Sequence, residues 1–92
     1  MNLNVQGIAV EFDPKKLADY RNMKRLYSIM ESGNLSEFDK WGVDIFGADQ
    51  WERMLDEFAA QHDGLVPVIG WVEFINEIMR AAKDADETVK NS

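Results

Sequence analysis

The residues of this 92-residue chain that could take part in acid–base chemistry are His62 and Asp63, its one imidazole and the carboxylate that follows it. A catalytic base must lie within hydrogen-bond reach of the proton that it removes, and a further group must orient it. The side chains of adjacent residues point apart, and no motif places a Ser or Cys nucleophile near this pair. A lone histidine at the end of a helix more often caps that helix. We therefore expect no catalytic residues and no enzyme activity.

Metal ligands are equally scarce in the sequence. The chain has one His and no Cys, and neither a His-x-x-x-His nor a Glu-x-x-His spacing occurs. The segment around Asp63 superficially resembles an EF-hand. Placing Gly64 at the sixth position of the calcium loop puts Ala59 at the first and Gly70 at the twelfth, where calcium requires Asp and Glu. We expect no metal and no other cofactor.

The charge balance is acidic, with 17 Asp and Glu against 10 Lys and Arg and a net charge of −7. Nucleic acids and anionic lipids bind surfaces with a positive field, so neither is an expected partner. Five cations nevertheless occur close together on the first expected helix: Lys15, Lys16, Arg21, Lys24 and Arg25. Such a face is more often solvated, or paired with acidic helices nearby, than used to bind phosphate.

The hydropathy of the chain does not indicate a membrane protein. No apolar run approaches the roughly 20 residues that a membrane-spanning helix needs. The start, Met1-Asn2-Leu3-Asn4, lacks the basic and apolar regions of a signal peptide. We therefore expect a cytosolic protein that has no membrane contact.

The first twelve residues have the pattern of a β-hairpin. Residues 3–5 and 8–12 each alternate between apolar and polar side chains, but the phase of the alternation changes across Gln6-Gly7. A two-residue turn that contains glycine explains this change. We expect a hairpin over residues 3–12. Because an isolated hairpin is marginally stable in water, a helix or a second chain must pack against it.

Residues typical of helix ends divide the rest of the chain into four expected helices. Asp13 followed by Pro14 opens the first, and Ser36 opens the second. Asp49 is expected to cap the third helix, and Pro67 to begin the fourth. The expected helices cover residues 14–31, 36–46, 49–61 and 67–83.

The fourth expected helix is unusually apolar and has only a narrow polar strip. Its apolar side chains occupy roughly 120° of the helix circumference. Such a helix is either the central one of a bundle or the one that meets a partner. Large aromatic residues often anchor interfaces. We therefore expect at least one of Trp71, Phe74 and Ile78 to bind a partner protein.

Together these elements predict a mainly α fold class, a small bundle of about four short helices preceded by a short N-terminal β-hairpin. Residues 1–83 are expected to form a single domain, in keeping with the length of the chain. Residues 84–92 are expected to form a flexible acidic tail.

Two segments carry a resemblance to a known family: residues 46–56, FGADQWERMLD, and residues 63–68, DGLVPV, which an apolar helix follows. This order resembles the tail assembly chaperones of long-tailed (siphovirus-like) bacteriophages and prophages. In those small acidic helical proteins, a Leu/Phe-Gly-x-x-Gln-Trp/Tyr block is followed by a short turn and an apolar closing helix. The opening of the chain, residues 5–12, is also similar to their short β start. The likeness covers residues 36–80 well and the first 30 residues loosely.

The resemblance implies a non-catalytic role in virion assembly. Such chaperones coat the hydrophobic, helical tape measure protein until tail tube subunits polymerise around it, and they are absent from the mature virion. The implied partners are the tape measure protein and, as a second candidate, the tail tube protein, both in the host cytoplasm. The resemblance carries over no catalytic residue.

Two other functions and an oligomer remain as alternatives. The net charge of −7 is compatible with a small acidic inhibitor, either a DNA mimic or an antitoxin-like protein that acts by protein–protein binding. The acidic residues are spread over several expected helices, which weakens this alternative. A minor enzyme subunit or hydrolase would need a pocket with converging polar groups, and the sequence offers few candidates. A homo-oligomer could form through the hairpin edges or through the last helix.

Overall fold

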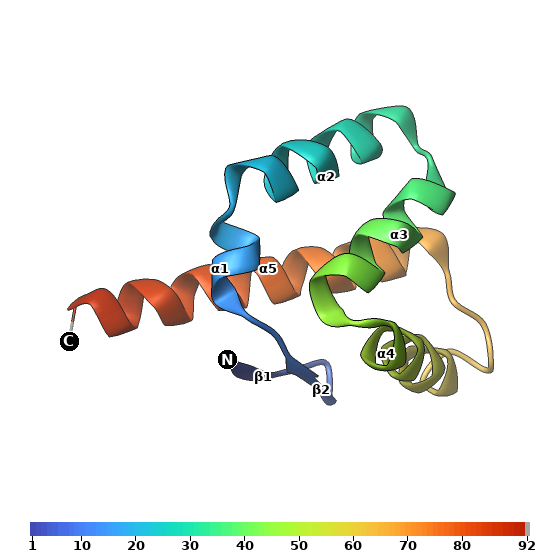
Figure 1. Cartoon of the computed structure of the whole chain (residues 1–92). Helices are drawn as coiled ribbons and strands as arrows, with labels where there is room; N and C mark the ends of the chain where they lie inside the picture. The colour runs from blue at the N-terminus through green and yellow to red at the C-terminus, as the bar shows by residue number, and fades with distance from the viewer. Residues whose placement is uncertain (92) are drawn as a thin grey trace.

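A two-stranded hairpin and five helices make up the described part of the chain, which confirms the expected mainly helical fold behind an N-terminal hairpin (Figure 1). The computed structural model describes the backbone of residues 1–91 and the side chains of residues 1–84. Within this part, no helix combines the length and the apolar character that crossing a membrane requires. The elements in chain order are β1 (Asn2–Val5), β2 (Ile8–Glu11), α1 (Pro14–Ala18), α2 (Tyr20–Ser32), α3 (Leu35–Phe46), α4 (Ala48–Ala60) and α5 (Val68–Asn91).

The hairpin has the turn that the sequence predicts. β1 and β2 pair antiparallel with Val5 opposite Ile8, which leaves Gln6 and Gly7 as the two turn residues. Both turn residues have positive φ, 54° and 80°, as a two-residue turn matched to the twist of the strands requires. Val5, Ile8 and Val10 are buried on the inner face of the hairpin.

The helix expected over residues 14–31 is two helices, α1 and α2, which meet at Asp19. The backbone of Asp19 is extended, with φ −73° and ψ 122°, and its side chain accepts hydrogen bonds from the backbone N–H groups of Arg21 and Asn22. The side-chain amide of Asn22 in turn donates to the backbone carbonyl of Lys16, which lies in α1. Asp19 therefore acts as the cap of a new helix, although its position fits the helical spacing of the residues around it.

Two other predicted helix ends also differ from the structure. α4 begins at Ala48 with Gly47 as its N-cap, so Asp49 lies in the first turn and is not the cap. α5 begins at Val68 and continues to Asn91, so the expected end near Lys83 is wrong. Of the tail predicted for residues 84–92, the last residue and the side chains beyond 84 lie outside the described part of the chain.

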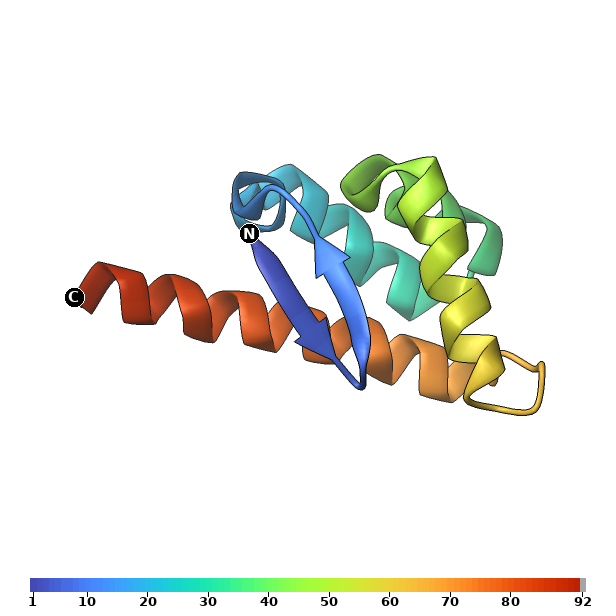
Figure 2. The same cartoon turned by 90° about the horizontal axis from the view of Figure 1, so that it is seen from below.

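The core lies between the hairpin, α3, α4 and the first half of α5. The hairpin crosses α5, and β2 lies beside α4 (Figure 2). α5 extends beyond the hairpin on the side of β1 (Figure 2). Aromatic rings fill much of the space between these elements, and the buried ones are Phe12, Phe38, Trp41, Phe46, Trp51, Phe58, Trp71 and Phe74.

Candidate functional site

The three residues predicted to bind a partner lie in the core. Phe74 and Ile78 are fully buried, and Trp71 is 7% exposed. The ring of Trp71 packs edge-on against Trp51, with a centroid distance of 5.0 Å, and also contacts Phe58. None of the three therefore lies at the surface of the isolated chain, so no exposed side chain supports the expectation that one of them binds a partner. The physical reason is that α5 is covered by two elements: the α4 rings of Trp51 and Phe58 pack against Trp71 and Phe74, and the hairpin packs on α5 through β1.

A concave surface lies elsewhere on the molecule, as a groove of about 1090 Å³ between α1 and α2 on one side and α5 on the other. α2 makes its main packing contacts with α1 and α3, and it stands apart from α5 (Figure 1). We call this surface the α2–α5 groove. Its apolar lining comes from Pro14, Leu17, Ala18, Met23, Tyr27, Met79 and Ala82, and its polar lining from Lys15, Glu73, Asn76, Glu77, Arg80 and Lys83.

One flank of α2 carries an exposed apolar stripe beside this groove. Tyr20, Met23, Tyr27 and Met30 recur at helical spacing, and Met23 and Tyr27 line the groove. Tyr20 is 77% exposed, Tyr27 64% and Met30 40%, although helical spacing places all three on one apolar arc with the buried Leu26. The core contacts of α2 are made by Leu26 and Ile29 on the neighbouring flank.

Sequence reasoning missed this stripe, but the residue types held a signal for it. Tyrosine combines a large apolar ring with a hydroxyl that water can satisfy, so it tolerates exposure and is enriched at interfaces. Methionine is flexible and is overused at surfaces that accept varied partners. One flank of the helix has two tyrosines and two methionines, and the neighbouring flank has Leu26 and Ile29. This pattern therefore indicates a contact surface beside a core-facing flank.

The α5 wall of the groove is charged. Glu73, Glu77, Arg80 and Lys83 lie on one face of α5 at spacings of three or four residues. Glu77 accepts a hydrogen bond from the side chain of Gln6 at 3.1 Å. The narrow polar strip that the sequence shows on this helix thus lines the groove, opposite the apolar stripe of α2.

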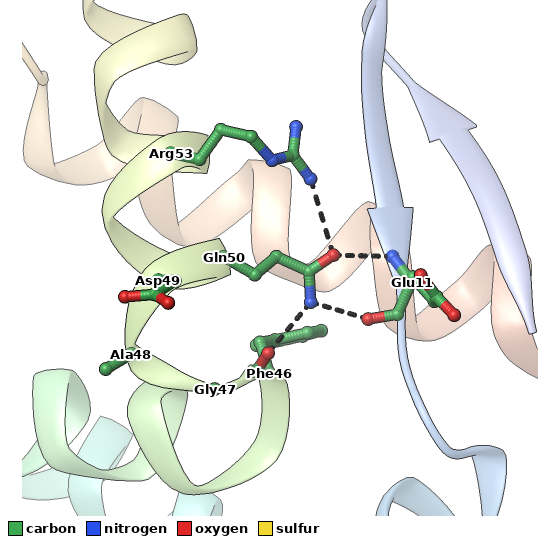
Figure 3. Close-up of a pocket in the computed structure, with 7 residues that line it drawn as sticks. All are labelled: Glu11, Phe46, Gly47, Ala48, Asp49, Gln50 and Arg53. Carbon is green, nitrogen blue, oxygen red and sulfur yellow. Dashed lines mark hydrogen bonds between the residues drawn. The ribbon is translucent and has the colours of Figure 1, made fainter.

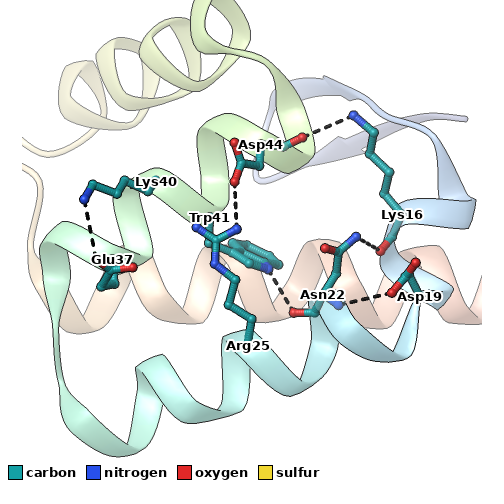
Figure 4. A network of polar contacts seen from close by, with 8 residues as sticks. All are labelled: Lys16, Asp19, Asn22, Arg25, Glu37, Lys40, Trp41 and Asp44. Carbon is teal, nitrogen blue, oxygen red and sulfur yellow. Dashed lines mark hydrogen bonds and ion pairs between the residues drawn. The ribbon is translucent and has the colours of Figure 1, made fainter.

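Polar contacts hold α1 and α2 against α3, on the side away from α5 (Figure 4). Arg25 forms an ion pair with Asp44 at 2.7 Å, and the ammonium of Lys16 donates to the backbone carbonyl of Asp44. The indole N–H of Trp41 donates to the backbone carbonyl of Asn22. Two of the five clustered cations therefore take part in helix packing, and α2 is held in a position that leaves the groove open.

A second, shallower hollow of about 620 Å³ lies where α4 meets β2, and its polar groups are bonded to one another (Figure 3). The side-chain amide of Gln50 accepts from the backbone N–H of Glu11 at 2.7 Å and donates to the backbone carbonyls of Glu11 and Phe46. The guanidinium of Arg53 donates to the backbone carbonyl of Ala9 at 2.6 Å. These contacts attach the hairpin to α4, so we assign this hollow a structural role.

His62 is a helix-end residue, as the sequence predicts. Its Nδ1 lies 2.8 Å from the backbone carbonyl oxygen of Phe58, and its ring stacks on the Phe58 ring at 4.2 Å. Asp63 follows in a left-handed turn conformation, with φ 57°. Among residues 1–84, no three His, Cys, Asp or Glu side chains are grouped as metal ligands would be.

Within residues 1–84, the α2–α5 groove is therefore our candidate surface for binding a partner. It can bind by apolar contact along α2 and by charge along α5, and it brings together no nucleophile and base. Comparisons with known proteins add no relative to this description: no family model, no curated protein and no solved structure matches the chain.

Proposed function

We propose that this protein is a non-catalytic tail assembly chaperone that binds the hydrophobic, helical tape measure protein of a long-tailed phage or prophage. It would act in the host cytoplasm and leave before the virion is complete, with the tail tube protein as a second partner. The observation that carries the proposal is the α2–α5 groove, which has one apolar wall and one charged wall.

This groove suits an amphipathic helix. In helix-in-groove recognition, the apolar face of the bound helix lies in the groove and its polar face stays in water. The rings and thioethers of Tyr27 and Met23 offer the apolar contact, and Met79 extends it on the α5 side. A net charge of −7 would keep the complex soluble while the apolar stretches of the partner are covered.

Co-expression with the tape measure protein of the same genome tests the proposal. We expect the tape measure protein to be soluble and to co-purify with the wild-type chain, and to be insoluble alone. If it gains no solubility and does not co-purify, the proposed function is wrong.

Two variants test whether the tape measure protein binds in the α2–α5 groove. Tyr27→Glu places a charge on the apolar wall, and the matched control Leu65→Glu places the same charge on an equally exposed apolar residue between α4 and α5. We expect Tyr27→Glu to abolish the gain in solubility and Leu65→Glu to retain it. If both variants retain the gain in solubility equally, the chaperone function holds but the tape measure protein binds at another surface.

A further inference from the structure

The charges that line the α2–α5 groove are separated by sign along its length. Glu73 and Glu77 precede Arg80 and Lys83 on α5, and all four line the groove. At 1.5 Å per residue, the centres of the two pairs lie about 10 Å apart along the helix axis. The groove therefore has an acidic end and a basic end.

The other wall strengthens this separation. Lys15 of α1 lines the groove as well, and α1 packs against α5. In Figure 1, α1 lies alongside the middle of α5 and next to the N-terminal end of α2, whereas the C-terminal end of α2 lies toward the beginning of α5. Lys15 thus adds a third cation at the basic end. Tyr27, which is closer to the C-terminal end of α2, lies toward the acidic end because α2 and α5 run in opposite directions (Figure 1).

These charges are available to a partner. Glu73, Arg80 and Lys83 are exposed, and within residues 1–84 none of them forms an ion pair. Glu77 keeps carboxylate oxygens for a partner beside its one contact with Gln6. A bound helix would shield these side chains from water on one side, which strengthens their attraction to opposite charges.

We infer that, given a groove that receives a helix as proposed above, its partner is an amphipathic helix whose charges are themselves separated by sign. The apolar stripe of that helix lies on Met23 and Tyr27. Its Lys or Arg residues lie beside Glu73 and Glu77, and its Asp or Glu residues lie at the opposite end, beside the cations. α2 has 13 residues, about 20 Å of helix, so the bound segment is three to four turns long.

Two helix-stapled peptides of about 14 residues test this inference. They share one apolar stripe and one composition, with three Lys and three Glu at the polar positions. In the segregated peptide the Lys residues occupy one half and the Glu residues the other, and in the interleaved peptide they alternate. Fluorescence anisotropy at low salt gives the Kd of each peptide for the full chain.

We expect the segregated peptide to bind about five- to tenfold more tightly than the interleaved one, since three or four partly exposed ion pairs each contribute modestly. The ratio of the two Kd values should fall toward one in 1 M salt, where charges are screened within about 3 Å. It should also fall to less than about twofold in the variant Glu73→Gln/Glu77→Gln/Arg80→Gln/Lys83→Gln, which keeps only Lys15 of the five groove charges. Because this variant loses two charges of each sign, it keeps the net charge of −7.

Three results would overturn the inference. Equal affinity for the two peptides, or a preference that is as large in the four-Gln variant as in the wild-type chain, means that the groove charges do not discriminate between the two charge patterns. Binding of neither peptide means that the groove does not receive a helix. The proposed function is tested separately by co-expression: it is wrong if the tape measure protein stays insoluble in the presence of the wild-type chain.

Discussion

The ring of Trp51 lies directly against the backbone of Gly42, so that a Cβ atom on Gly42 would overlap three of the ring carbon atoms. Both residues are buried, and the indole N–H of Trp51 donates to Asp39 at 2.6 Å, which fixes the ring in place. α3 and α4 can therefore approach closely only because position 42 has no side chain.

We expect Gly42→Ala to destabilise the chain by about 1 to 3 kcal/mol, the usual cost of overpacking a core, even though alanine favours helix. Gly70→Ala in α5 is the matched control, because its Cβ would lie 3.4 Å from the nearest atom of Phe58, at van der Waals contact. Thermal unfolding followed by circular dichroism compares the two. Equal stability of both variants would contradict the close packing of Trp51.

The difference in burial between Phe74 of α5 and Tyr27 of α2 gives a second prediction. Phe74→Ala should lower the free energy of unfolding by about 3 to 5 kcal/mol, because the ring is fully buried. Tyr27→Ala should change it by less than about 0.5 kcal/mol, because its side chain is exposed in the isolated chain. Urea unfolding gives both values. A large loss for Tyr27→Ala would place Tyr27 in the core and remove the apolar wall of the groove.

The amide of Gln50 gives a third prediction. Gln50→Ala should cost about 1 to 2 kcal/mol, because it removes hydrogen bonds to both backbone groups of Glu11. Gln50→Glu keeps the acceptor for the Glu11 N–H and loses the donor. Hydrogen exchange at the Glu11 amide should therefore speed up in Gln50→Ala and remain slow in Gln50→Glu. Slow exchange in both variants would mean that the amide is protected by something other than residue 50.

The parts of the fold that depend on local chemistry could be predicted from the sequence. The phase change at Gln6-Gly7 predicted the hairpin, and Asp13 with Pro14 predicted the first helix start, where Asp13 does cap α1. The break at Asp19 could not be predicted, because an aspartate at that position also fits the outer face of a continuous helix. The structure shows the break by the extended backbone of Asp19, its capping hydrogen bonds to α2 and the contact between Asn22 and α1.

The candidate site depends on tertiary packing, which the sequence pattern does not contain. An apolar arc shows that a helix packs against something, but not against what. The sequence predicted the hairpin and predicted the apolar α5, yet not that the first covers the second. The apolar arc therefore predicts at least one partner-facing residue among Trp71, Phe74 and Ile78, whereas all three are buried, and Tyr27 on α2 is exposed.

The side chains of Gln50 and Arg53 have a last consequence, for self-assembly. They bond the outer backbone groups of Glu11 and Ala9 on β2, so this strand cannot accept another one there. Within residues 1–84, no side chain bonds the outer edge of β1 in the same way. When a second copy pairs through its own β1, both outer edges of the joined sheet are β2 strands bonded to α4, so pairing between copies of this hairpin ends at two chains.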